Sequence, residues 1–231
     1  AVENPTNRSN VGVAIFVTDP SKITSNDYNV IAKHYLQCFR EFGDNHKGVD
    51  WPNLEGANKR YSVMMAGIPS NSGSTILDFG CGLGHMLDYI NNESENNIDY
   101  TGVDINDEFV ELCKVKFPDR VFLSGDILEG KLEGLKDSYD YIISNGVFTH
   151  KSELSFDNMW DYTKSVIREL WKITGRHLII NFMSKNVDWE RDDCFHLPMD
   201  TLADFLCKEI TRDFILRNDY QLYEYAVIIY K

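Results

Sequence analysis

A run of glycines directly after an apolar strand pattern has the clearest chemical meaning in this chain. The segment Ile76-Leu77-Asp78-Phe79-Gly80-Cys81-Gly82-Leu83-Gly84-His85 passes from apolar residues through an acid to glycines at every second position. Glycine lets the backbone turn sharply and lets a ligand approach it closely. The unpaired N–H groups of the helix expected next would point at that ligand. The segment therefore predicts a nucleotide-like cofactor at the first strand-to-helix crossover of an α/β sheet.

The spacing of the glycines selects among such cofactors. The dinucleotide fingerprint G-x-G-x-x-G needs its third glycine at position 85, where this chain has His85. The third glycine is Gly84, so the pattern is D-x-G-x-G-x-G, and a nicotinamide-dependent oxidoreductase is disfavoured. The pattern resembles motif I of class I S-adenosylmethionine (SAM) dependent methyltransferases. The resemblance implies that the cofactor contacts Asp78, Gly80, Cys81, Gly82, Gly84 and His85.

A second acid lies where this family binds the ribose. Asp104 ends the short apolar run 100–105, about 20 residues beyond the glycine turn, which is the offset expected of a ribose-binding acid. A carboxylate can accept hydrogen bonds from two neighbouring ribose hydroxyls at once. Ile105 would then present an apolar face to the adenine.

Two later segments extend the resemblance. Asp126 follows the strand-like residues 121–123 and resembles the acid that accepts from the adenine amino group, with Ile127 packing on the ring. Residues 139–150 match the fourth-strand motif of the family, whose end lies beside the methyl group, and Asn145 falls there. Four such segments in order, at βαβ intervals, make the resemblance specific.

The elements that must position these residues alternate regularly along the chain. Expected strands cover 75–79, 99–103, 120–124, 139–144 and 176–182, and expected helices cover 84–92, 106–116 and 156–173. A helix at 199–209 and two strands near 211–217 and 223–230 follow, with Asn218-Asp219-Tyr220 as a hairpin-type turn. The fold implied is α/β and Rossmann-like: a seven-stranded sheet, mostly parallel with an antiparallel last strand, and helices on both faces.

The region before this alternation suggests a lid. Residues 1–26 are expected to form an N-terminal extension that includes a strand-like run at 11–17. Residues 27–70 carry helical patterns at 27–42 and 54–68, and the resemblance implies that they form a helical lid on the substrate side. Residues 71–231 would be the SAM-binding core.

His150 is the first candidate for a catalytic base. It lies five residues past Asn145, just after the expected end of the fourth strand, where the methyl acceptor should approach. Imidazole titrates near neutral pH, as a general base should. The alternative is that His150 only shapes the loop by hydrogen bonding to backbone.

Several other side chains are candidates for binding the acceptor. Trp51 could stack on it, and Lys47 could pair with a carboxylate or phosphate. Tyr35 lies on the preceding helix, Asn181 ends the fifth strand, and His196 lies in the loop that follows. For each of them a purely structural role remains open.

Composition limits the partners. The formal net charge of −13 disfavours a nucleic-acid substrate, and the N/D-P-P-Y/F motif of adenine amino-methyltransferases is missing from the fourth strand. No metal is expected, because Asn145 and Asn181 stand where metal-dependent catechol methyltransferases have acids, and the acidic run at 188–193 suits a solvated loop. Five unpaired cysteines and the lack of a long apolar run predict a cytoplasmic protein without membrane contact. A homodimer and a longer parent polypeptide both stay open.

The functional prediction is SAM-dependent methyl transfer to a small polar acceptor, with S-adenosylhomocysteine (SAH) as product. The acceptor atom is expected to be an oxygen of a hydroxyl or carboxylate, as in a sugar or organic acid. The alternative is a SAM-binding module without activity that serves a larger polypeptide.

Overall fold

The centre of the molecule is a mixed β-sheet whose main strands are parallel. The computed structural model describes residues 25–69, 73–93, 98–130 and 132–231. The strands are β1 (Thr75–Phe79), β2 (Asp99–Asp104), β3 (Val121–Ser124), β4 (Tyr139–Ser144), β5 (Thr174–Ser184), β6 (His196–Leu197), β7 (Phe214–Arg217) and β8 (Glu224–Tyr230). Their order is β3-β2-β1-β4-β5-β8-β7, and β8 is antiparallel to both of its neighbours. The predicted seven-stranded sheet with an antiparallel last strand is confirmed; the two-residue strand β6, paired with β5, was not predicted.

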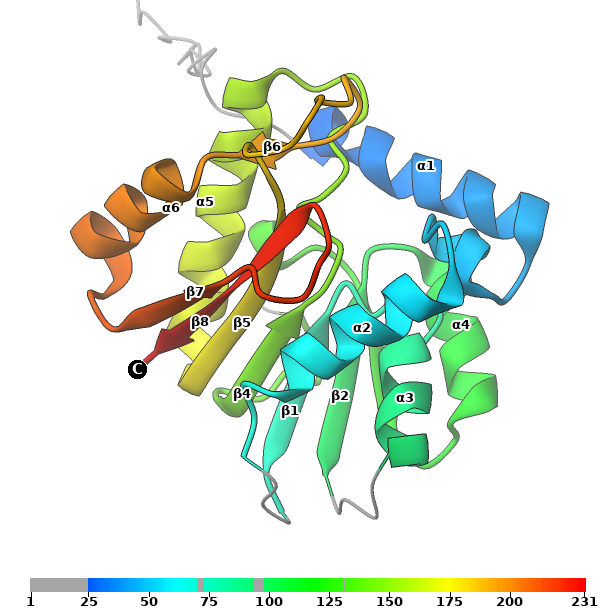
Figure 1. The fold of residues 1–231 in the computed structure, drawn as a ribbon. Coiled ribbons are helices and arrows are strands. Elements are labelled where there is room, and N and C mark those ends of the chain that lie inside the picture. The colour runs from blue at the N-terminus through cyan, green and yellow to red at the C-terminus, as the bar shows by residue number, and fades with distance from the viewer. Residues whose placement is uncertain (1–24, 70–72, 94–97, 131) are drawn as a thin grey trace, which may run out of the picture.

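Helices cover both faces of this sheet (Figure 1). On one face, α2 (Leu54–Met65), α3 (His85–Glu93) and α4 (Asp107–Lys116) pack in one apolar cluster with Ile76 and Ile143. On the other, α5 (Phe156–Ile173) and α6 (Met199–Phe205) pack with Leu77 and Ile142. Neighbouring residues of one strand thus serve opposite faces, as the two-residue period of a strand requires. Strands buried on both sides read as continuous apolar runs, which is why these strands were visible in the sequence.

The N-terminal helix closes the edge of the sheet where the parallel strands end. In Figure 1, α1 (Ser25–Phe42) crosses beyond the carboxyl ends of β1 and β2, and its Tyr28 and Ile31 are buried in the core. Gly43 ends the helix at φ 72°, and its N–H bonds the carbonyl of Phe39 at 2.7 Å. The short helix η1 (His46–Val49) then leads to α2. A helical segment therefore lies over the strand ends, while the predicted division of the chain at residues 26 and 70 stays a prediction.

Three sequence expectations differ from the structure or fall outside it. The expected helix 199–209 is α-helical only to Phe205 and continues as a one-turn π-helix, Leu206–Ile210. The link between β7 and β8 is the six-residue segment 218–223 and not a tight three-residue turn. The expected strand at 11–17 lies outside the described residues. Among the described helices, none is long and apolar enough to cross a membrane.

Candidate cofactor site and active site

A cavity opens at the carboxyl ends of β1, β2 and β4, beneath α1. This edge of an open α/β sheet is where such folds bind ligands. The predicted cofactor residues that line it are Asp78, Gly80, Cys81, Gly82, His85, Asp104, Ile105, Asp126 and Asn145. The predicted acceptor residues that line it are Tyr35 and Trp51. Folding therefore brings these residues from six separate sequence segments to one site.

The glycine turn after β1 needs its glycines for two different reasons. Gly80 has φ 76°, and its N–H bonds the carbonyl of Val103 at 2.8 Å. A Cβ at Gly80 would lie 2.1 Å from the side chain of Val147. Gly84 was expected to contact the cofactor but does not line the cavity; a Cβ there would lie 2.7 Å from the ring of Phe117. The third glycine serves the close packing of the turn against α4.

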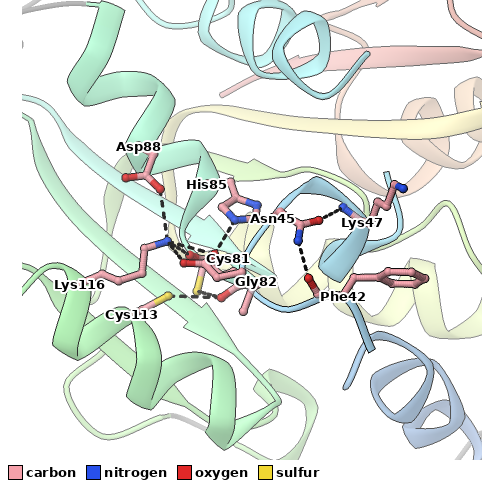
Figure 2. Close-up of polar contacts among 11 residues, drawn as sticks. Phe42, Asn45, Lys47, Cys81, Gly82, His85, Asp88, Cys113 and Lys116 are labelled. Atoms are coloured by element: carbon pink, nitrogen blue, oxygen red, sulfur yellow. Dashed lines mark hydrogen bonds and ion pairs between the residues drawn. The ribbon is translucent and has the colours of Figure 1, made fainter. Parts of the chain in front are cut away.

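A lysine from α4 fixes the turn and joins it to the segment that follows α1. Lys116 Nζ donates to the carbonyl of Leu83 at 2.8 Å. The same Nζ lies 3.3 Å from a carboxylate oxygen of Asp88, as Figure 2 shows. The same Nζ lies 3.0 Å from Asp44, which follows α1. His85 Nε2 lies 2.8 Å from the other Asp44 oxygen, so the predicted cofactor residue is tied to the segment that follows α1.

Two buried carboxylates stand at the ends of β1 and β2. Asp104 accepts hydrogen bonds from the N–H groups of Gly82 and Asn106, each at 2.9 Å, and is 8% exposed. Burial raises the pKa of Asp104 to about 6. Asp78 accepts from the hydroxyl of Tyr100 at 2.6 Å, and burial raises its pKa to about 7. Asp104 therefore holds the glycine turn and presents a carboxylate where the ribose was predicted.

Aromatic rings enclose the end of the cavity beside β3. Asp126 accepts from the N–H of Leu128 at 2.8 Å and from the hydroxyl of Tyr28, which reaches it from α1. The ring of Tyr28 stacks on that of Tyr162, with centroids 4.5 Å apart, and both line the cavity. Ile127, predicted to pack on the adenine, lies in the core and does not line the cavity. This aromatic end of the cavity suits a flat heteroaromatic ring whose amino group can reach Asp126.

The end of β4 offers an acceptor without a partner. Asn145 Oδ1 is buried and has no hydrogen-bond partner within the described structure. Leaving such an atom unpaired is costly, so it suits a ligand that brings a donor, such as the ammonium group of the methionine part of SAM. Next to it, Tyr35 donates to the carbonyl of Gly146 at 3.3 Å. A Cβ at Gly146 would lie 2.9 Å from the ring of Trp51, so Trp51 packs directly on the end of β4. The residues present therefore fit SAM.

Two predicted acceptor contacts have structural partners instead. Asn181 does not line the cavity: its Oδ1 accepts from the N–H of Gly146 at 2.7 Å, and its Nδ2 donates to Glu224 at 2.8 Å. His196 is buried in β6, where Nδ1 lies 2.7 Å from the carbonyl of Ser184 and Nε2 accepts from the N–H of Arg191 at 3.2 Å. With both ring nitrogens paired, His196 orders the loop after β5.

Lys47 also lies away from the cavity. Its Nζ is 5.9 Å from the centroid of the Phe42 ring, and its backbone N–H bonds Asn45 Oδ1 at 2.9 Å, as Figure 2 shows. In the described structure the Lys47 side chain is exposed on η1.

A buried ion pair supports the residues around the strand end. Arg60 of α2 donates through Nε to Glu224 of β8 at 2.9 Å, and both side chains are almost fully buried, at 8% and 2% exposed. Glu224 in turn accepts from Asn181, which holds Gly146. The Arg60 guanidinium lies 4.2 Å from the centroid of the Trp51 ring. The ion pair thus supports two residues that line the cavity: Trp51 directly, and Gly146 through Asn181. Neither Arg60 nor Glu224 lines the cavity itself.

His150 lies beside the cavity and does not line it. Its ring stacks on that of His34, with centroids 3.9 Å apart, and lies 6.2 Å from the ring of Tyr35, which does line the cavity. It is 5% exposed, and Nδ1 is 4.0 Å from Asp193. Burial, followed by the neighbouring His34, lowers the pKa of His150 to about 4. The imidazole is therefore neutral at physiological pH, but it is a weak base in this conformation.

Sequence reasoning missed one wall of the cavity. Tyr162 projects from α5 and lines the aromatic end of the cavity beside Tyr28. From the sequence, its position in an amphipathic helix looks like ordinary core packing. Tyr28 and Ile31 had a usable signal, because they share one face of α1 with Tyr35 at spacings of three and four residues.

Comparison with known proteins agrees with this geometry. The sequence profile of a family described as "Methyltransferase domain" matches residues 77–176, from β1 to the start of β5. The chain is a class I SAM-dependent methyltransferase. A Mycobacterium tuberculosis (strain H37Rv) protein named as methyltransferase Rv1506c is 26% identical over 160 residues, covering 68% of this chain and 93% of that protein.

Solved structures of similar fold include other methyltransferases. The magnesium protoporphyrin IX methyltransferase of Synechocystis PCC 6803 with bound SAM superposes with a TM-score of 0.61 at 14% identity, over 90% of this chain and 99% of that one. The phosphoethanolamine N-methyltransferase 2 of Haemonchus contortus with SAM gives 0.57 at 15% identity, over 81% of this methyltransferase and 43% of that chain. At these identities the likeness concerns the fold.

The raised pKa values of the two buried acids predict a pH-dependent cofactor affinity. Ribose hydroxyls donate to an ionised carboxylate, so a protonated Asp104 must lose its proton before it can accept two hydrogen bonds. SAH affinity should therefore fall as the pH drops below about 6, the pKa of Asp104. Asp78 would extend the dependence towards pH 7. Calorimetric titration from about pH 5 to about pH 8 measures it, and a flat profile in wild type would contradict the assignment. In Asp104→Asn, the part of the pH dependence of SAH affinity that lies near pH 6 should disappear.

Proposed function

We propose that this methyltransferase transfers the methyl group to the hydroxyl oxygen of a small, uncharged polar acceptor. The observation that carries the proposal is the lining of the cavity. Among the described residues that line it there is no lysine and no arginine, and five are tyrosine or tryptophan: Tyr28, Tyr35, Trp51, Tyr61 and Tyr162. A buried carboxylate or phosphate is costly without a cationic partner. Of the two oxygen acceptors predicted from the sequence, a hydroxyl suits this lining better than a carboxylate.

Methyl transfer from SAM requires mainly that the protein position the acceptor oxygen relative to the methyl group. SAM supplies a methyl group that its sulfonium already makes electrophilic. The acceptor oxygen forms its bond to the methyl carbon as the carbon–sulfur bond breaks, and the hydroxyl proton must leave to a base or to water. The contacts of Tyr35 and Trp51 with Gly146 support a role for both side chains in excluding water and orienting the acceptor against the end of β4.

An acceptor screen tests this proposal. The purified protein is incubated with SAM and matched sets of hydroxyl, carboxylate and amine compounds of similar size, and SAH release is measured. We expect turnover to be confined to hydroxyl compounds, with phenols and sugars as the first set. Turnover of carboxylates alone, or of amines alone, would overturn the choice of acceptor and leave the methyltransferase assignment intact. If no compound of any set gives SAH release, the alternative of a SAM-binding module without activity would be favoured.

The role of His150 as the base stays a prediction and has its own test. If His150 takes the acceptor proton, His150→Ala should abolish turnover of the identified acceptor and leave SAH affinity unchanged. His177 is a matched control, because its ring is also packed between aromatic rings, those of Tyr141 and Tyr230, and does not line the cavity. Full turnover in His150→Ala would exclude the role.

A further inference from the structure

Three side chains with metal-binding atoms meet on the outer side of the lid. His34 and Cys38 are one turn apart on α1, and Asp50 follows η1. His34 Nε2 lies 3.0 Å from Asp50 Oδ2 and 3.7 Å from Cys38 Sγ. One ligand atom from each of the three lies within 4.8 Å of the other two. None of the three lines the cofactor cavity.

The separations match those within a tetrahedral zinc site. Bonds of about 2.0–2.3 Å at tetrahedral angles place nitrogen, oxygen and sulfur ligands roughly 3.2–3.8 Å apart. The nitrogen–sulfur distance already lies in this range, and the nitrogen–oxygen distance is just below it. Only the carboxylate needs to rotate to approach the sulfur. Residues at i and i+4 of a helix face the same side, so His34 and Cys38 are pre-aligned.

The ligand types select the metal. A cysteine sulfur with an imidazole suits Zn²⁺ and disfavours Mg²⁺ and Ca²⁺, which prefer oxygen ligands. The side chains of His34 and Asp50 are 30% and 40% exposed, so an ion can enter and keep water as its fourth ligand. The ring of His34 is held in place by stacking on His150. The backbone N–H of Asp50 bonds the carbonyl of Lys47 at 3.0 Å, which fixes the loop that carries the carboxylate.

We propose that His34, Cys38 and Asp50 bind one Zn²⁺ that fastens α1 to the segment following η1. The sequence analysis expected no metal from Asn145, Asn181 and the acidic run at 188–193, and nothing in the sequence spacing joins Asp50 to the helix pair. The site has a structural consequence for the cavity: Tyr35 lies between the two helix ligands, and Val49 and Trp51 flank Asp50, and all three line the cavity. Zinc at this site holds both lid segments in the arrangement that closes over the cofactor.

Direct titration of the full chain tests the site without reference to catalysis. Competition with a chromogenic chelator should give one Zn²⁺ per chain for wild type, and Co²⁺ should give a thiolate charge-transfer band. Cys38→Ser should remove that band and weaken Zn²⁺ binding by more than about 100-fold, because loss of outer-shell partners alone costs 10–100-fold. Asp50→Asn should weaken binding and keep the band. Cys207→Ser is the matched control, since Cys207 is also a half-buried free cysteine.

The outcomes separate this site from the proposed function. No Zn²⁺ binding by wild type, or equal binding by Cys38→Ser and wild type, would overturn the site and leave methyl transfer untouched. Zinc binding that is lost in Cys38→Ser and kept in Cys207→Ser supports it, whatever the acceptor screen gives. Tighter SAH binding in the presence of Zn²⁺, in wild type and Cys207→Ser and not in Cys38→Ser, supports the fastening of the lid.

Discussion

Asp104→Asn should weaken the binding of SAM and SAH by more than about 100-fold, because two hydrogen bonds to a charged group are worth roughly 1.5–3 kcal/mol each. The substitution keeps the size of the side chain and removes its charge and one acceptor. Asp104 also accepts from the N–H groups of Gly82 and Asn106, so Asp104→Ala should loosen the glycine turn in addition and abolish binding. Isothermal titration calorimetry measures both effects.

The control for this prediction comes from the other end of the same strand. Asp99 begins β2, is exposed, and pairs with Lys136. Asp99→Asn should therefore bind SAH as wild type does, since it changes the net charge equally and leaves the cavity intact. Wild-type affinity in Asp104→Asn would show that the ribose is not bound at this carboxylate.

Arg60→Met should destabilise the fold by about 3–5 kcal/mol, because it leaves the Glu224 carboxylate buried without its partner. Both side chains of the pair are almost fully buried, so water cannot replace the lost contact. For a chain of this length the melting temperature should drop on the order of 10 °C. Urea unfolding, compared at equal slope, measures the change in the free energy of unfolding.

Two further variants show whether burial is the reason. Arg168 and Glu209 form an ion pair whose side chains are 40% and 43% exposed. Arg168→Met should therefore lower the free energy of unfolding by no more than about 1 kcal/mol. The double variant Arg60→Met with Glu224→Met removes both charges and should recover much of the loss, since an apolar pair of similar volume can replace a buried ion pair. Equal decreases in the free energy of unfolding for Arg60→Met and Arg168→Met would contradict the explanation by burial.

The fold could be predicted closely from the sequence, because local patterns carry it. The predicted bounds of β1, β4 and α5 coincide with the observed ones, since each is an apolar run or an amphipathic stretch with a clear cap or turn at its end. The two-residue strand β6 is too short to leave a pattern. The π-helical turn after α6 was also not visible, since its apolar spacing resembles that of an ordinary helix.

The cofactor side of the site was more predictable than the acceptor side. Glycines and acids at strand ends are placed by the backbone, so Asp78, Asp104 and Asn145 reach the cavity as expected. Lys47 instead has local contacts, with Asn45 and Phe42, on the exposed surface, whereas the partners of Asn181 come from distant segments of the chain. For Asn181 those partners are the backbone of Gly146 and the carboxylate of Glu224, 35 and 43 residues away. No local pattern reports such contacts.

The most direct test of the central claim is calorimetric titration of the purified protein with SAM and SAH, with NAD as a control. We predict micromolar or tighter binding of both sulfur cofactors at one site per chain, lost in Asp104→Ala, and no binding of NAD. Binding of NAD, or of none of the three ligands, would contradict the assignment of the glycine turn and its cavity to SAM.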